Sequence, residues 1–243
     1  MASATLSVII PLYNKEREIG DTVRSVLAQT LQPAEIVVVD DGSTDGSADI
    51  VRGIASPLIK LVTQANAGEC AARNRAIAES TGDYIALLDA DDTWEPGFLE
   101  EIAAMIAEFP GCGIYSTAFN IVSHDGCFPA CTPSERGVVG NFFRDSAHRY
   151  ISIPSASAIP RAVFESVGGF PEGMKIGGDQ YMWIKIARRY PVCFSPRLLV
   201  NYSKVASNRS SAIYTPERTR YYFEELYDPS APGEYNEFVA RAA

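Results

Sequence analysis

Histidine and positive charge are both scarce in this 243-residue chain, and each shortage excludes a class of function. The two histidines, His124 and His148, have no serine or cysteine nucleophile motif beside them, which argues against a catalytic triad. Lysine and arginine number 21 against 30 acidic residues, so the net charge is −9 and no nucleic-acid partner is expected. A single bound nucleotide is compatible with this charge, because one local cluster of residues can override the average.

Long hydrophobic runs and paired cysteines are missing as well. No apolar run approaches the ~18 residues that a transmembrane segment requires, and the first residues lack the basic region of an export signal. The five cysteines are an odd, scattered set that is unsuited to a disulfide framework. Cys127 and Cys131 lack a second Cys/His pair at zinc-finger spacing, so buried small side chains are the simpler interpretation. We therefore expect a cytoplasmic protein.

Strand and helix patterns alternate along the first half of the chain. Short apolar runs predict strands over 6–10, 35–39, 58–63 and 84–88, and helical patterns fall over 19–30, 47–54, 68–80 and 96–109. This alternation predicts an α/β fold with a mostly parallel central sheet flanked by helices. In such sheets, ligands bind beyond the carboxyl ends of the strands, where this sequence places polar residues.

The second half of the chain is less regular. It predicts a strand over 114–122, an irregular insertion or flap over 123–150, a strand over 156–160 with a short helix to 167, a helix over 178–189, and a helical stretch over 220–227 before a frayed polar end. No linker or internal repeat divides the sequence. We therefore expect a single domain over 1–243.

Two acidic motifs directly follow predicted strands. Asp41 belongs to an Asp-Asp-Gly-Ser turn, which could accept hydrogen bonds from a base or a ribose, or could simply be an Asp-rich turn that caps a helix. Asp89, Asp91 and Asp92 fall within four positions, and extended geometry would send the first two to the same side. Such a pair suits a ribose and a hard cation such as Mg²⁺ or Mn²⁺, and the alternative is a solvated acidic turn.

Three further residues invite a functional interpretation. Arg73, in the predicted helix over 68–80, could reach a nucleotide or could form salt bridges on a solvated helical face. Asp179 follows two glycines at the start of a predicted helix, where it could cap that helix or act as a general base. Trp183, one turn further on, is either a core residue or part of a cleft wall.

In their order and spacing, these motifs resemble glycosyltransferase family 2, whose members are inverting enzymes with the GT-A fold. The matching segments are residues 7–14, 39–45, 66–68 with 72–74, 82–92 and 168–170, so the resemblance covers roughly residues 6–185. The resemblance implies a nucleotide-binding half over about 6–110, an acceptor-binding half over 111–215 and a C-terminal helical tail over 216–243. It also implies a nucleotide-sugar donor, of the UDP type or alternatively dTDP or GDP.

The resemblance also assigns roles to individual residues. Donor binding would involve Pro11, Leu12, Tyr13, Asp41, Asn66, Arg73, Asp89 and Ala90. Tyr13 would stack on the base, Asp41 would accept a ring N–H, and Arg73 would support the base or the diphosphate. Asp89 and Ala90 would contact the ribose, and Asp91 would coordinate Mn²⁺ or Mg²⁺ that bridges the diphosphate. Asp179 would be the general base.

The sequence departs from the family pattern in two places. Gly178 stands where the residue before the base is usually acidic, and no histidine follows the last core strand, so Lys204 and Arg209 are the candidates to close over the diphosphate. Other residues that could border a donor or acceptor pocket are Gly168, Gly169 and Trp183.

The family commonly builds surface polysaccharides and lipid-linked glycans. The resemblance therefore implies a glycan or lipid-linked acceptor and peripheral association with the inner face of the membrane. Two alternatives remain open. One is a sugar nucleotidyltransferase, although residues 11–15 are not the glycine-rich basic loop that such an enzyme needs. The other is a nucleotide-sugar-binding protein without catalytic activity.

Overall fold

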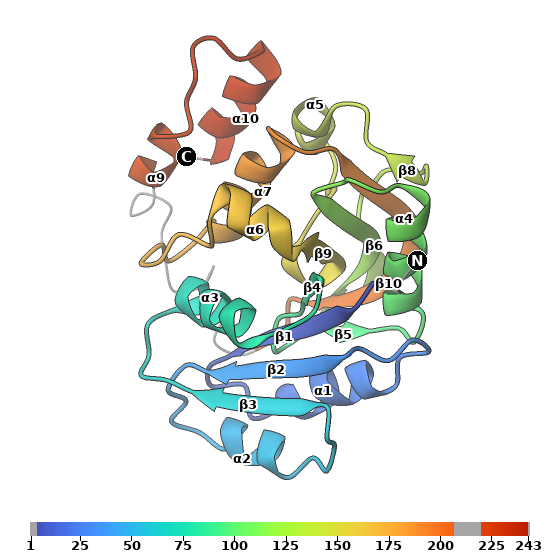
Figure 1. The fold of residues 1–243 in the computed structure, drawn as a ribbon, viewed down its shortest axis with the longest axis vertical. Helices are drawn as coiled ribbons and strands as arrows, with labels where there is room; N and C mark the ends of the chain where they lie inside the picture. Colours follow the sequence, from blue (N-terminus) through green and yellow to red (C-terminus); the bar gives the residue numbers. More distant parts are fainter. Residues whose placement is uncertain (1–3, 207–219, 243) are drawn as a thin grey trace.

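The computed structural model describes residues 4–206 and 220–242, and its core is one mixed sheet (Figure 1). Its strands are β1 (Leu6–Leu12), β2 (Glu35–Asp40), β3 (Ile59–Thr63), β4 (Tyr84–Leu87), β5 (Thr93–Trp94), β6 (Ile114–Ser123), β7 (Gly126–Pro129), β8 (Gly137–Val138), β9 (Ser157–Pro160) and β10 (Val192–Ser203). The order is β3-β2-β1-β4-β9-β6-β10-β5, with β7 beside β6 and β8 beside β10. Strands β3, β2, β1 and β4 are parallel, and so are β6 and β10. The prediction of a mostly parallel α/β sheet is confirmed.

Helices cover both faces of this sheet. They are α1 (Ile19–Leu27), α2 (Ser47–Arg52), α3 (Glu69–Glu79), α4 (Phe98–Glu108), α5 (Phe142–Ser146), α6 (Arg161–Val167), α7 (Gly178–Ala187), α9 (Arg220–Glu224) and α10 (Gly233–Ala242), with a 3₁₀ turn over Pro154–Ala156. One hydrophobic core packs α1 and α4 against the sheet, and a second packs α3, α6 and α7 against its other face. Alternate residues of β1 serve both cores, as Val8 and Ile9 show. Burial on both faces explains why the strands read as continuous apolar runs.

Strand β1 runs through Pro11 to Leu12, beyond the end that the sequence predicts. Pairing with β4 ends at Ile9 and Leu87, while pairing with β2 continues to Leu12 and Asp40. On the β4 side, therefore, no neighbouring strand requires the N–H that proline lacks.

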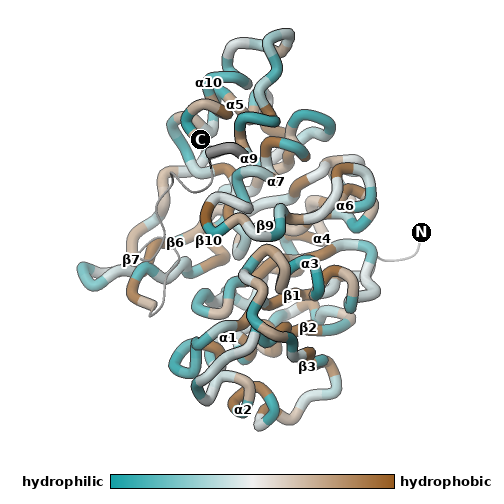
Figure 2. Tube along the Cα trace, turned by 90° about the vertical axis from the view of Figure 1, so that its left-hand side faces the viewer, coloured by the Kyte–Doolittle hydropathy of each residue, from teal (hydrophilic) through white to brown (hydrophobic). Residues whose placement is uncertain are grey.

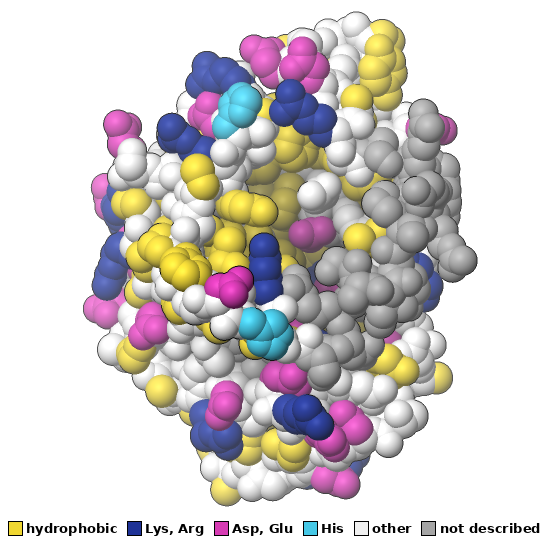
Figure 3. Space-filling model, turned by 180° about the vertical axis from the view of Figure 1, so that it is seen from behind, with side chains coloured by type: hydrophobic (Ala, Val, Ile, Leu, Met, Phe, Trp, Pro, Cys, Tyr) yellow, Lys and Arg dark blue, Asp and Glu magenta, His cyan; other side chains and the backbone are white. Residues whose placement is uncertain are grey.

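The largest differences from the predicted elements lie in the second half. The predicted flap over 123–150 contains β7, β8 and α5, and the hairpin formed by β6 and β7 projects from the body of the protein (Figure 2). The prediction of a frayed end is wrong, because α10 buries Tyr235 and Val239 against the second core. Seen from behind, the molecule is hollowed, and hydrophobic side chains gather in the hollow (Figure 3). Within the described ranges, no helix has both the length and the apolar character needed to cross a bilayer.

Candidate active site

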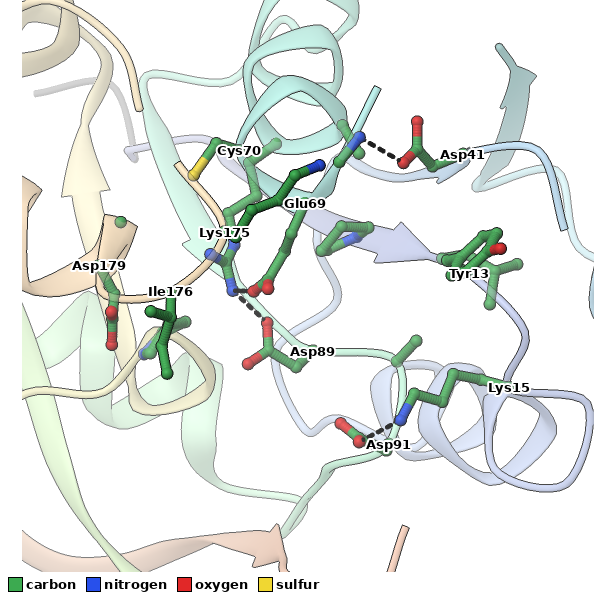
Figure 4. A pocket seen from close by; sticks show the side chains of 18 of the residues that line it. Tyr13, Lys15, Asp41, Glu69, Cys70, Asp89, Asp91, Lys175, Ile176 and Asp179 are labelled. Atoms are coloured by element: carbon green, nitrogen blue, oxygen red, sulfur yellow. Dashed lines mark hydrogen bonds and ion pairs between the residues drawn. The ribbon is translucent and has the colours of Figure 1, made fainter. Parts of the chain in front are cut away.

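A cavity of about 400 Å³ lies at the carboxyl ends of β1, β2 and β4 (Figure 4). Every residue that the sequence assigns to the donor, the metal or the base lines it: Pro11, Leu12, Tyr13, Asp41, Asn66, Arg73, Asp89, Ala90, Asp91 and Asp179. Tyr13 and Asp41 lie on one side of the cavity and Asp179 on the other. The structure therefore brings together side chains from segments that are far apart in the sequence.

Asp41 holds the turn that leads into α3. One of its carboxylate oxygens accepts hydrogen bonds from the Ala67 N–H (2.9 Å) and the Gln64 amide (2.8 Å), and the other accepts from the Gly68 N–H (2.8 Å). Gly68 has a φ of +94°, which favours glycine at this turn. A carboxylate can accept about four hydrogen bonds. Three protein donors thus leave Asp41 with capacity for one more at the cavity surface.

The other interpretation of this motif, an Asp-rich turn, applies to the neighbours of Asp41. The buried Asp40 accepts a hydrogen bond from the Ser43 N–H at 3.1 Å. Asp45 accepts from the N–H and the hydroxyl of Ser47 at the start of α2. The motif therefore combines turn formation with a carboxylate that faces the cavity.

Arg73 is the buried cation of the site. Its guanidinium forms an ion pair with Glu69 and another with Asp89 at 2.6 Å, and it lies over the ring of Phe170. Burial alone would lower the pKa of Arg73, but the two carboxylates raise it. Although Arg73 lowers the pKa of Glu69, burial and the negative charges of Asp89, Asp179 and Asp91 leave it raised. Arg73 does form salt bridges, but in the interior rather than on a solvated face.

The 89–92 segment is a turn rather than the extended chain that we predicted. The Asp92 N–H donates to the Asp89 carbonyl at 3.1 Å, yet Asp89 and Asp91 both line the cavity. Asp92 instead accepts the Ser155 hydroxyl (2.5 Å) and the Ser203 N–H (2.7 Å). Burial and the nearby charges of Asp91 and Asp89 raise the pKa of Asp92 well above its usual value. Asp92 thus ties the turn to the end of β10.

Asp91 already has a cationic partner. Its carboxylate lies 2.8 Å from the Lys15 ammonium, and only 16 % of the Asp91 side chain and 10 % of the Lys15 side chain are exposed. Burial raises the pKa of Asp91, and Asp89 adds to the effect while Lys15 opposes it. Lys15, which follows the Tyr13-Asn14 pair after β1, was not among the predicted site residues.

The donor set fits a divalent cation that takes most of its ligands from a bound diphosphate. Asp89 and Asp91 offer carboxylate oxygens to the cavity, which is the ligand type that Mg²⁺ and Mn²⁺ prefer. Within residues 4–206 and 220–242, no group of three or more His, Cys, Asp and Glu side chains forms a ready-made metal cage. One or two carboxylates completed by substrate phosphates is a common arrangement for Mg²⁺.

Asp179 is the second residue of α7. Gly177, with a φ of +82°, occupies the N-cap position, so Asp179 is not needed for the capping role that we considered. Burial raises the pKa of Asp179, although Arg73 opposes the shift. A Cβ atom on Gly178 would lie 2.5 Å from the sulfur of Cys70, which gives a steric reason for the missing acidic residue before Asp179.

Of the remaining predicted pocket residues, the four that the structure describes do not line the cavity. Gly168 ends α6 with a φ of +85°, and Gly169 packs against Asn74. Trp183 is 3 % exposed within the second core, and Lys204 is exposed and pairs through its backbone with β6. Arg209 lies outside the described residues.

Several lining residues were not predicted: Lys15, Glu69, Cys70, Ile153, Pro154, Met174, Lys175, Ile176, Tyr202 and Ser203. Glu69 could have been found, because it lies four residues before Arg73 on a predicted helix. The 174–176 segment follows the Gly168-Gly169 pair and forms the wall between α6 and α7. Cys70 on α3 contacts Met174 of this segment, and burial raises the pKa of its thiol to about 12, so the thiol is protonated at neutral pH.

The model of the glycosyl transferase family 2 matches residues 7–168. The chain belongs to this family. It is 44 % identical over 105 residues to the uncharacterized glycosyltransferase YibD of Escherichia coli, a match that covers 42 % of this chain and 30 % of YibD. It is 37 % identical over 124 residues to the putative teichuronic acid biosynthesis glycosyltransferase TuaG of Bacillus subtilis, a match that covers 50 % and 49 % of the two chains. The chain therefore spans from under a third to about half the length of these curated relatives.

Two solved structures of other proteins have a fold similar to that of this chain. The S. aureus TarS fragment 1–349 in complex with UDP-GlcNAc superposes with a TM-score of 0.82 at 23 % identity, covering 98 % of this chain and 71 % of TarS. The mannosyltransferase PcManGT of Pyrobaculum calidifontis, in complex with GDP-Man and Mn²⁺, superposes with a TM-score of 0.71 at 24 % identity, covering 99 % and 69 %. These similarities confirm the predicted GT-A architecture.

Proposed function

We propose that this protein is an inverting glycosyltransferase that moves a sugar from a UDP-sugar to an acceptor hydroxyl. The observation that carries this proposal is that Asp41, Asp91 and Asp179, from three separate segments, line one cavity at the strand ends. Structures of similar fold hold UDP-GlcNAc and GDP-Man, which supports a nucleoside-diphosphate sugar. A dTDP- or GDP-sugar is the alternative donor.

The nucleoside would lie between β1 and α3. Tyr13, 38 % exposed at the cavity, offers a ring face on which a base can stack. The remaining acceptor position of Asp41 suits the N–H of a uracil ring. Asp89, oriented by Arg73, would accept a ribose hydroxyl beside Ala90. This half of the cavity therefore recognises the nucleoside.

Asp91, with Asp89 nearby, would hold Mn²⁺ or Mg²⁺ at the diphosphate. The ion would supply charge neutralisation for the departing diphosphate. Lys15 and Lys175, which also line the cavity, add positive charge to it. The cavity is thus suited to an anionic leaving group despite the net negative charge of the chain.

Asp179 would take the proton from the acceptor hydroxyl as its oxygen attacks the anomeric carbon. A new carbon–oxygen bond forms while the bond to the diphosphate breaks on the opposite face, so the configuration inverts. The raised pKa of Asp179 makes the carboxylate a stronger base than an exposed aspartate.

The acceptor would approach along a row of aromatic side chains, here called the aromatic strip (Tyr202, Phe119, Tyr150 and Phe128). Register pairs place Phe128, Ile121 and Tyr202 side by side across β7, β6 and β10. The ring of Phe119 contacts those of Tyr150 and Tyr202 edge to face. Tyr202 lines the cavity, whereas Phe128 and Tyr150 are 55 % and 50 % exposed. Aromatic rings present flat apolar faces that suit sugar rings, so the strip favours a glycan acceptor.

The biological setting is the synthesis of a surface polysaccharide or a lipid-linked glycan. The name of the relative TuaG from Bacillus subtilis supports this setting, since it refers to teichuronic acid biosynthesis. A lipid-linked acceptor would bring a cytoplasmic enzyme to the inner face of the membrane.

A two-stage experiment tests the proposal. A panel of nucleotide sugars is first screened by thermal shift with and without Mn²⁺, because a ligand that binds only the folded state raises Tm. The donor that binds is then incubated with glycan acceptors, and the products are analysed by mass spectrometry and NMR. We expect metal-dependent donor binding and a product with inverted anomeric configuration. Binding without turnover would favour a nucleotide-sugar-binding protein, and release of pyrophosphate from a nucleoside triphosphate would favour a nucleotidyltransferase.

A further inference from the structure

We propose that Lys15 is an exchangeable counter-ion, which holds the Asp91 carboxylate while the divalent cation is absent and releases it when the cation binds. The inference rests on the proposed function, in which Asp91 is the metal ligand. It adds a role for a residue that belongs to neither the nucleoside-binding nor the base-providing part of the site.

The backbone at Lys15 is held firmly, so the exchange involves only its side chain. The Lys15 N–H donates to the Ser47 hydroxyl at 2.7 Å, and the Asn14 N–H donates to the Ser43 hydroxyl at 3.0 Å. The Asn14 side chain in turn accepts the Thr44 N–H at 2.8 Å. These bonds tie the turn after β1 to the turn after β2. The four-carbon stem of lysine can still swing its ammonium between partners.

The three carboxylates of the 89–92 turn have different partners. Asp89 is paired with Arg73, whose planar guanidinium is shared with Glu69 and cannot turn without breaking both ion pairs. Asp92 is held by neutral donors on the far side of the turn. Asp91 is paired instead with the single ammonium of Lys15, which ends a four-carbon stem with several rotatable bonds. Of the three, Asp91 therefore has the partner that is most easily displaced.

The Lys15 ammonium and a divalent cation compete for the same carboxylate. A buried carboxylate requires a cation, because an unpaired charge with little solvent access is costly. Lys15 supplies that charge before the cation arrives, while direct contact of both cations with one oxygen would bring like charges together. A cation that binds without the donor must therefore break the ion pair between Lys15 and Asp91. This cost lowers the affinity of the site for the cation alone.

The exchange links metal binding to donor binding. Once released, the Lys15 ammonium still lies in the cavity that would hold the diphosphate, so a phosphate oxygen can replace Asp91 as its partner. The cation and the diphosphate then favour each other's binding, because the cation pairs with the Asp91 carboxylate and the diphosphate pairs with the released Lys15 ammonium. The ion pair thus favours loading of the metal together with the donor.

The test measures Mn²⁺ binding directly, without any turnover. Free Mn²⁺ is quantified by electron paramagnetic resonance during titration of the wild type, Lys15→Met, Lys15→Arg and Asp91→Asn, each with and without UDP. Lys60→Met is the matched control, because Lys60 carries the same charge but lies on β3 outside the cavity, where it is paired with Glu79. Circular dichroism checks that each variant is folded.

We expect Lys15→Met to bind Mn²⁺ alone about tenfold more tightly than the wild type, as loss of a buried ion-pair competitor permits. The same variant should gain less Mn²⁺ affinity from UDP. Lys15→Arg, which can hold Asp91 through two N–H groups, should bind Mn²⁺ alone more weakly, and Lys60→Met should show neither change. If Lys15→Met binds Mn²⁺ like the wild type while Asp91→Asn loses binding, the exchange is refuted and the metal role of Asp91 stands. Wild-type Mn²⁺ binding by Asp91→Asn would overturn both.

Discussion

The side-chain amide of Asn74 forms hydrogen bonds with both backbone groups of Phe170. Its oxygen accepts the Phe170 N–H at 2.8 Å, and its nitrogen donates to the Phe170 carbonyl at 2.9 Å. Asn74 lies on α3 next to Arg73, and Phe170 begins the segment that leads to Asp179. This pair therefore joins the nucleoside side of the cavity to the wall that carries the proposed base.

Replacing Asn74 with alanine should impair catalysis more than donor binding. Loss of the two bonds leaves the backbone groups of Phe170 without their partner, at a cost of roughly 1–3 kcal/mol in the free energy of unfolding. A shifted 170–178 segment would also misplace Asp179 while leaving the contacts of Tyr13 and Asp41 intact. Urea unfolding, kcat and the Kd for UDP measure the three effects. An unchanged kcat in the destabilised variant would show that the link serves stability alone.

Gly169 provides an independent check of the same link. A Cβ atom at this position would lie 2.5 Å from the Asn74 oxygen, so Gly169→Ala should break the contact from the other side. A double-mutant cycle then shows whether the two substitutions act through the same contact or have independent effects on stability and kcat. We expect the Asn74→Ala and Gly169→Ala double variant to resemble Asn74→Ala alone, whereas additive losses would contradict a shared contact.

The elements that the sequence predicted best are those whose pattern is local. Strands β1 and β2 are buried on both faces and contain continuous apolar runs, so their positions are evident without any tertiary information. Strand β10 was not predicted, because Pro196 and Arg197 interrupt its apolar run where the register with β6 shifts. Helix α10 lies within the predicted helical tail over 216–243, but its packing against the core was not foreseen, because only Tyr235 and Val239, four residues apart in a charged segment, are buried.

The same distinction holds for the site. Asp41, Asp91 and Asp179 could be predicted, because the first two stand in turns that follow strands and the third follows a glycine pair at the start of a helix. The pairing of Lys15 with Asp91 joins residues 76 positions apart, and that of Asn74 with Phe170 joins residues 96 apart. Neither pairing leaves a periodic or compositional trace in the sequence. Residues such as Lys15 and Asn74, which position or pair with other residues of the site, could therefore be found only from the structure.

Asp179→Asn should abolish transfer and preserve donor binding. An asparagine of nearly the same shape cannot take the acceptor proton, so kcat should fall by about 10²–10⁴. The Kd for UDP with Mn²⁺ should stay within about twofold of the wild type, since Asp179 lies across the cavity from Tyr13 and Asp41. Asp21→Asn, a change on the exposed face of α1, serves as the control. Retention of full activity in Asp179→Asn would reject the base assignment.

The activity should fall on the acidic side at a higher pH than an exposed aspartate would give. Burial raises the pKa of Asp179, and only the deprotonated carboxylate can accept a proton, so the active fraction is lost as the pH falls through that raised pKa. The dependence of kcat/KM on pH measures this limb. Because the pKa of Asp91 is raised too, the affinity for Mn²⁺ and UDP must be followed over the same range. If the loss of activity at low pH only matches the loss of affinity for Mn²⁺ and UDP, it would be caused by protonation of Asp91 and not of Asp179.

Asp92→Asn should stabilise the protein at neutral and alkaline pH. Because its pKa is raised in the folded state, Asp92 binds a proton more tightly there than in the unfolded chain, and its contribution to stability falls as the pH rises above the unfolded value. Asparagine carries no charge; its amide oxygen can accept the Ser203 N–H, and its amide nitrogen can donate to the Ser155 hydroxyl. We expect a Tm gain of roughly 2–4 °C at pH 8, or ~1 kcal/mol, that disappears in acid. A lower Tm at pH 8 would mean that the charge itself is needed.

Tyr150→Ala tests whether the aromatic strip holds the acceptor. Tyr150 is half exposed and its ring contacts Phe119, so its removal should take away a stacking surface without opening the core. Loss of one ring contact should raise the acceptor KM about 3–10-fold and leave the donor KM unchanged. Tyr150→Phe should keep the wild-type values, because stacking needs the ring and not the hydroxyl. Tyr227→Ala removes a similarly exposed tyrosine (59 %, against 50 % for Tyr150) from the C-terminal tail and is the matched control. Equal acceptor KM values in all four proteins would place the acceptor on another surface.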